Sequence, residues 1–357
     1  MATITNRTLI FDCWVIPAYV SVSVPSGTRL CTIEIETKRM REISRRLFFV
    51  VLLVAPLAFG QPADGQERIR VVATTGMIAD AARQIGGNLI GVQALMGPGV
   101  DPHAYRQTRT DIAAMAKADL VLWNGLYLEA QLEDFLLDLA EGARVVAVAE
   151  AVPQDLLLGS EDYDNRFDPH LWMDPELWSR VVVVVREALI DAHPPGEAVF
   201  RTNADAYLAQ LQKLASYTDD ALSSVPADSR VVVSSHDAFN YFGHAYGFDV
   251  VGIQGISTES EAGLRRIAEL VDMLVARDIR AVFVETSVSD RNIRALIEGA
   301  AARDHRVVVG GELYSDAMGE PGTYEGTYIG MIDHNTTTIT AALGGKAPDT
   351  GMQGLLN

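Results

Sequence analysis

The sequence predicts an α/β protein of two lobes with parallel sheets, joined by one long helix. Three observations lead to this prediction. Short apolar runs alternate with helical patterns from Ile69 onward, the alternation stops at a long amphipathic stretch in mid-chain, and it then begins again and continues to about residue 345. Continuous apolar strands separated by helices are typical of parallel sheets whose two faces are both covered.

The first lobe is predicted over residues 67–190. One helix stands out because Met77, Ile78, Ala81 and Ile85 keep helical spacing and are followed by Gly86-Gly87. Further helical patterns cover residues 109–118 and 127–142, and the strand candidates are residues 69–74, 89–95, 119–125 and 143–149. Strands and helices therefore alternate through this lobe.

A long helix is expected to connect the lobes. Residues 174–193 read as a helix in spite of their valines, because the stretch is longer than a strand, and Pro194-Pro195 ends it. The stretch 195–224 then keeps apolar residues along one face over about 40 Å, at 1.5 Å of rise per residue. We expect it to be a rigid connector to a second Rossmann-like lobe over 228–345, where strand and helix patterns alternate as in the first.

The charge of the chain restricts its partners. Its 357 residues carry a formal net charge of −18, and 48% of them are hydrophobic, which suits a globular protein with a sizeable core. A strongly acidic chain is not expected to bind nucleic acid or an anionic membrane surface. We expect a monomer that does not bind nucleic acid.

Residues 1–60 are predicted to be a leader that contains a signal peptide. Basic residues precede an apolar h-region at 47–59, and a small-x-small pattern places cleavage near Gly60. The apolar run is too short to span a bilayer as a helix. Met40 is the hypothesised start of translation, because residues 1–39 fit poorly before such a leader. Cys13 and Cys31 both lie in this leader, so the exported protein is expected to have no disulfide, thiolate metal site or lipidated cysteine. The signal peptide predicts that the exported protein is periplasmic.

Three histidines occupy comparable places in this pattern. His103 and His170 each end an Asp-Pro-His tripeptide, and His236 follows the first strand of the second lobe. Proline restricts the backbone, so such a loop presents its histidine in a defined direction. Loops at the carboxyl ends of parallel strands form the ligand crevice of open α/β sheets. Each motif alone is weak, but three together suggest one metal site.

A fourth ligand is expected from the segment after the last strand. Asp316, Glu312, Glu320 and Glu325 all lie there, and their spacing alone does not select one of them. Glu285 ends another strand and is a candidate to orient a ligand histidine through its second ring nitrogen.

The chain resembles the metal-binding receptors of ABC importers, the cluster A-I solute-binding proteins. The similarity runs from about Ile69 to Leu343 through VVATTGMIADAA, LMGPGVDPHAY, DLVLWNGLYLEAQ, DPHLWMDPELW, SSHDAFNYFGHAYG, GISTESEAG, FVETSVS and GGELYSDAMGEPGTYEGTYIGM, in family order. The resemblance implies two α/β lobes, a rigid connecting helix and a metal ion between the lobes. It also implies the ligands His103, His170, His236 and Asp316, and a receptor that delivers its metal to a membrane permease.

Zinc and manganese remain alternatives for the metal. The chain lacks the long His-rich loop of zinc-dedicated members, and it has His236 where some manganese-dedicated members have glutamate. Imidazole ligands favour zinc, whereas a bidentate Asp316 would give the five-coordinate site that manganese tolerates better.

The alternative function is a secreted zinc hydrolase with three histidine ligands and Asp316 or Glu285 as general base. A site closed by four protein ligands favours a receptor without enzyme activity over a hydrolase. The sequence also contains no HExxH element.

Overall fold

The computed structural model describes residues 68–160 and 166–356. The predicted leader, its cleavage near Gly60, Met40 and both cysteines therefore lie outside the described residues. Within those residues, no helix combines the length and apolar character needed to span a bilayer. The described residues fall into one compact unit, so the predicted domain limits at 67–190, 195–224 and 228–345 stay predictions.

The first lobe contains a four-stranded parallel sheet, as predicted. Its strands are β1 (Ile69–Ala73), β2 (Ile90–Ala94), β3 (Leu120–Trp123) and β4 (Val145–Ala147), in the order β2-β1-β3-β4. Val71 is in register with Val92 of β2 and with Leu120 of β3. All four residues of β3 are buried, which explains its unbroken apolar sequence.

Helices α2 (Gly76–Gly86), α3 (Arg109–Met115) and α4 (Glu133–Ala140) connect these strands. The side chain of Thr108 caps α3 by accepting the backbone N–H of Asp111. The Asp111 carboxylate in turn accepts the backbone N–H of Thr108, which completes a capping box. Helix α5 (Pro175–Ala192) has proline in its first turn and is capped by Asp174. Its valines belong to a helix, as predicted, because Val181, Val182 and Val185 lie on its buried face.

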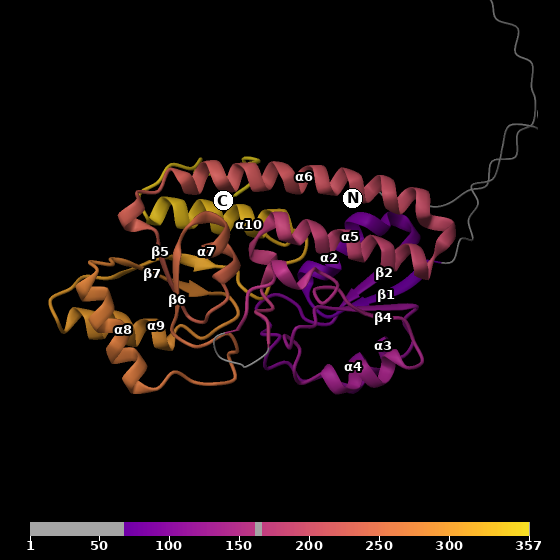
Figure 1. Cartoon of the computed structure of the whole chain (residues 1–357), viewed down its shortest axis with the longest axis horizontal. Helices are drawn as coiled ribbons and strands as arrows, with labels where there is room; N and C mark the ends of the chain where they lie inside the picture. Colours follow the sequence, from indigo (N-terminus) through magenta and orange to yellow (C-terminus); the bar gives the residue numbers. More distant parts are fainter. Residues whose placement is uncertain (1–67, 161–165, 357) are drawn as a thin grey trace, which may run out of the picture. The chain divides into compact units, whose positions relative to one another are not determined.

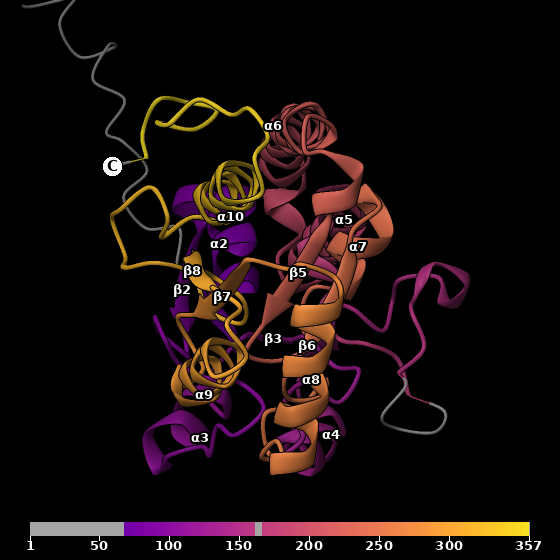
Figure 2. The ribbon, with the colours of Figure 1, turned by 90° about the vertical axis from the view of Figure 1, so that its left-hand side faces the viewer.

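Helix α6 (Glu197–Ser223) is 27 residues long and runs along both lobes (Figure 1). It packs on α5 and α2 at one end and on α10 (Tyr328–Ala342) at the other, and α6 and α10 lie side by side in both views (Figure 2). The hydroxyls of Tyr217 and Thr337 form a hydrogen bond of 3.0 Å between these two helices. The long helix is therefore part of the shared core as well as a connection.

The second lobe contains four strands, again all parallel where they pair. Strand β5 (Val231–Ser234) pairs with β6 (Asp249–Gly252), and β7 (Ala281–Glu285) pairs with β8 (Val308–Leu313). Helices α7 (Asn240–Tyr246), α8 (Leu264–Ala276) and α9 (Arg291–Ala301) lie between them. Strands β5 and β7 are neighbours without ladder hydrogen bonds, so the four strands of this lobe form two two-stranded sheets.

Replacing Phe200 tests the contribution of α6 to the core. Phe200 is completely buried on α6, so Phe200→Ala should lower the free energy of unfolding by about 3–5 kcal/mol. The neighbouring Val199 is 43% exposed, and Val199→Ala should change it by less than about 0.5 kcal/mol. Urea denaturation of the metal-free protein measures both. Equal effects of the two substitutions would show that this face of α6 does not form core.

Candidate metal centre

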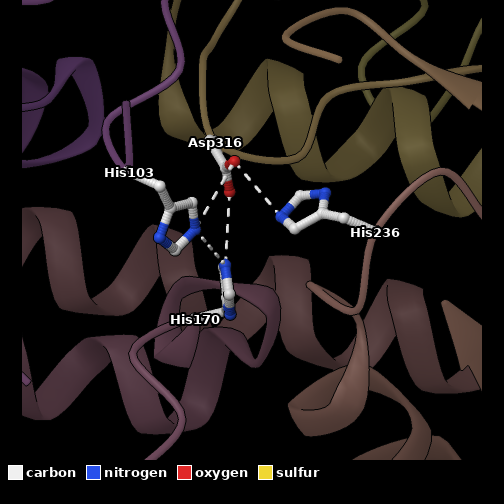
Figure 3. A group of neighbouring side chains, drawn as sticks. All are labelled: His103, His170, His236 and Asp316. Carbon is white, nitrogen blue, oxygen red and sulfur yellow. Dashed lines mark hydrogen bonds and ion pairs between the residues drawn. The ribbon is translucent and has the colours of Figure 1, made fainter. Parts of the chain in front are cut away.

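The structure brings His103, His170, His236 and Asp316 together. One ligand atom of each lies within 4.8 Å of those of the other three, and all four residues are buried. Figure 3 shows the three imidazoles and the carboxylate pointing toward one another. His103 follows β2, His236 follows β5 and Asp316 follows β8, so three of the four come from loops after the carboxyl ends of parallel strands.

The separations suit a small cation. His103 Nε2 lies 3.3 Å from His170 Nε2, and Asp316 Oδ2 lies 3.2 Å from His236 Nε2. Asp316 Oδ1 lies 3.4 Å from His170 Nε2. Ligand atoms at roughly 2.0–2.1 Å from a tetrahedral zinc ion would be about 3.3 Å apart, which is close to this arrangement.

Three buried atoms of this cluster make no hydrogen bond. They are His236 Nε2 and both carboxylate oxygens of Asp316. Buried polar atoms are nearly always satisfied, because leaving one without a partner costs free energy. A divalent cation between these atoms would satisfy all three. The donor set, imidazole nitrogen with carboxylate oxygen, is one that zinc and manganese accept.

Two carboxylates fix the direction of two of the rings. Asp168 Oδ1 accepts from His170 Nδ1 at 2.7 Å, and Glu285 Oε2 accepts from His236 Nδ1 at 2.5 Å. Each ring is therefore turned so that its Nε2 faces the centre, the arrangement found around protein-bound metals. Glu285 Oε1 also accepts the backbone N–H of His236, at 2.9 Å.

The repeated Asp-Pro-His tripeptide has a common local structure. In each copy the aspartate accepts the backbone N–H of the histidine two residues later, Asp101 for His103 and Asp168 for His170, both at 2.9 Å. The aspartate and the proline together fix the loop that carries the histidine. The two aspartates have no role in the expectations drawn from the sequence, which concern the proline. Each aspartate nevertheless stands two residues before its histidine, and this repetition is visible in the sequence.

Hydrogen bonds tie the segment of His170 to the segment of Asp316. Trp172 Nε1 donates to the carbonyl of Ser315 at 2.8 Å, and the Tyr328 hydroxyl donates to the carbonyl of Trp172 at 2.8 Å. Trp172 lies two residues after one candidate ligand, and Ser315 lies one residue before another. Residues from distant parts of the chain thus hold the centre together.

Raised pKa values on two of the rings, His170 and His236, balance the buried carboxylate charge of the metal-free centre. Burial raises the pKa of Asp316, but the His236 and His170 rings outweigh burial and hold that pKa well below its usual value. Burial lowers the pKa of His103 to about 3, so this imidazole is neutral and its lone pair is available. Burial opposes charge on His170 as well, yet the Asp168 carboxylate raises its pKa to about 9. The centre thus contains an ionised carboxylate and a neutral ring.

Burial separates the alternative carboxylates. Glu312 and Glu320 are exposed, whereas Asp316 is 2% exposed and faces the rings. Glu285, considered above as a general base, uses both oxygens to hold His236. It therefore orients a histidine, and neither of its oxygens is left to activate water.

The fold and the centre define a class of protein: two α/β lobes with a buried group of side chains, able to ligate a metal ion, between their loops. Residues 71–342 match the family described as "Zinc-uptake complex component A periplasmic", and the chain belongs to this family. The family is one of binding components of uptake complexes and not of enzymes.

Named relatives cover most of the chain. It is 48% identical over 284 residues to the manganese-binding lipoprotein MntA of Bacillus subtilis (strain 168), covering 80% of this chain and 92% of the relative. It is 45% identical over 289 residues to the zinc-binding protein TroA of Treponema pallidum (strain Nichols), with the same two coverages. The solved structure of that periplasmic zinc-binding protein matches with a TM-score of 0.76 and 45% identity, over 78% of this chain and 99% of the solved one.

Replacing Glu285 by glutamine tests the orientation of His236. Glutamine has one acceptor oxygen, so it cannot accept both N–H groups of His236 as the carboxylate does. Glu285→Gln should lower zinc affinity by about 10- to 100-fold, as loss of an outer-shell partner does elsewhere. Competition with a chromogenic chelator measures the affinity. Glu298→Gln, on the exposed surface of α9, is the matched control and should have no effect; an equal loss in both variants would contradict the assignment.

Proposed function

We propose that this protein is an extracytoplasmic solute-binding protein of an ABC transporter, which captures a divalent transition metal and delivers it to a membrane permease. The observation that carries the proposal is the buried convergence of three imidazoles and one carboxylate, three of whose atoms make no hydrogen bond. Membership of the periplasmic uptake family supports the same function.

The proposed ligands of one metal ion per chain are His103, His170, His236 and Asp316. The side chains come from both lobes, so a bound ion would join them. Four protein ligands close the site and leave no coordinated water to activate, which suits capture and release rather than hydrolysis. The zinc hydrolase is not favoured, because Glu285 is committed to His236 and the family is not one of enzymes.

Zinc and manganese are both proposed as cargo. Three imidazoles favour zinc in intrinsic affinity. Both oxygens of Asp316 lie near the rings and make no hydrogen bond, so bidentate binding and a five-coordinate ion, which suits manganese, are open to it. The relatives follow the same division, since one is named for manganese and the other for zinc.

The periplasm and a membrane permease are the proposed setting. The family is described as periplasmic, and the relatives are named as a lipoprotein and as a periplasmic protein. The predicted signal peptide, with cleavage near Gly60, agrees with export. A monomer follows as the proposed state, since one chain supplies all four ligands.

Metal analysis of the purified protein tests the proposal directly. Wild type should hold one zinc or manganese ion and bind both in competitive titration. Asp316→Ala should lower the affinity by more than the roughly 100-fold that loss of an outer-shell partner costs. Glu312→Gln is the control, because this exposed carboxylate lies four residues away and should not affect binding. A wild type without tightly bound divalent metal, or an Asp316→Ala variant with unchanged affinity, would contradict the proposal.

Zinc affinity should fall as the pH falls. The pKa of His170 in the metal-free protein is about 9, so its ring carries a proton at neutral pH that must leave before the nitrogen can bind a cation. For each proton that must leave on binding, the apparent affinity falls about tenfold for every pH unit below the pKa of the group that carries it. Chelator competition between about pH 8 and about pH 6 measures the slope. Constant affinity across this range would show that no ligand proton is displaced.

A further inference from the structure

One hydrogen bond joins the loop that carries His103 to the second lobe. The hydroxyl of Thr258, in the loop after β6, donates to Asp101 Oδ2 at 2.5 Å. The other oxygen of the same carboxylate, Oδ1, accepts the backbone N–H of His103 at 2.9 Å. A single carboxylate therefore connects a candidate ligand of the first lobe with a loop of the second.

The loop that carries Thr258 is itself held in place. Gln254 is buried, and its side-chain amide donates to the carbonyls of Thr258 and Ser260 at 3.2 and 3.0 Å. The backbone N–H of Gln254 donates to the carbonyl of Ser235, the residue before His236. The connection thus runs from beside one candidate ligand, His236, through Gln254, Thr258 and Asp101 to another, His103.

The two side chains of this hydrogen bond are only partly buried. Asp101 and Thr258 are each half-buried, whereas His170 and His236 are 0% exposed. A polar pocket of about 150 Å³ borders the contact and is lined by Asp101, Gln254 and Thr258, among others. Water in such a pocket can compete for the Thr258 hydroxyl, so this bond can open while the buried bonds of His170 and His236 persist.

We infer that Asp101 is a positioning residue that acts through Thr258: their hydrogen bond holds the His103 loop against the second lobe and slows release of the metal ion. This inference rests on the proposed function. The expected sequence of release begins with loss of the Thr258 bond, which frees the His103 loop to move away from the remaining three ligands.

The rate of zinc release tests the inference. The zinc-loaded full chain is mixed with an excess of a chromogenic chelator, and the release rate is followed by stopped flow. Thr258→Val keeps the shape of the side chain but removes the donor, and release should be roughly tenfold faster, as expected for one hydrogen bond to a charged group. Thr258→Ser keeps the hydroxyl and should restore the slow rate.

Two further variants separate this role from a general structural one. Ser257→Ala removes the neighbouring hydroxyl, which accepts the backbone N–H of Glu259 within its own loop, and should release zinc at the wild-type rate. Asp101→Ala removes the carboxylate and should release zinc at least as fast as Thr258→Val. Adding Thr258→Val to Asp101→Ala should cause no further acceleration, because both substitutions remove the same bond.

Each possible result decides the question. A Thr258→Val variant that releases zinc at the wild-type rate, or whose effect adds fully to that of Asp101→Ala, overturns the inference and leaves the proposed function intact. Equal acceleration by Ser257→Ala overturns it too, because the effect would belong to the loop and not to the bond. A wild type that binds no zinc overturns the proposed function itself, and the inference with it.

Discussion

The structure depends on one buried charge. Asp316 lies three residues after the end of β8, its pKa is held well below the usual value, and neither of its oxygens makes a hydrogen bond. An isolated buried carboxylate is costly, so it persists only where positive charge or a metal ion faces it. The His170 and His236 rings face it with positive charge in the metal-free protein, and His103 completes the group. These four residues come from separate segments, which the fold brings to one point.

The framework around the centre is built from buried helix contacts and hydrogen bonds. Asp80 of α2 accepts the backbone N–H of Tyr328 at the start of α10, while the Tyr328 hydroxyl holds the carbonyl of Trp172. Helix α6 packs against α2, α5 and α10, so elements from both lobes share one support (Figure 1). This arrangement keeps His170 and Asp316 in a fixed relation through Trp172 and Ser315.

A receptor must also release its cargo, and the four candidate ligands of the proposed site are held unequally. His170 and His236 are each oriented by a buried carboxylate. His103 is held through its backbone N–H, which Asp101 accepts, and the second oxygen of Asp101 accepts from Thr258 beside a polar pocket. Under the proposed function, the firmly held His170 and His236 would serve tight capture, and the less firmly held His103 would serve delivery to a permease.

The sequence alone determined the α/β alternation, because strand and helix periodicities are local properties of the chain. It also marked His103 and His236, whose loops follow predicted strands, and His170, which ends the second Asp-Pro-His tripeptide. Spacing did not distinguish Asp316 from Glu312, and the family resemblance was needed to choose. Only the tertiary structure showed one carboxylate buried and the other exposed, and assigned Asp168 and Glu285 to their histidines. Those facts depend on where loops of separate strands meet, which no local pattern encodes.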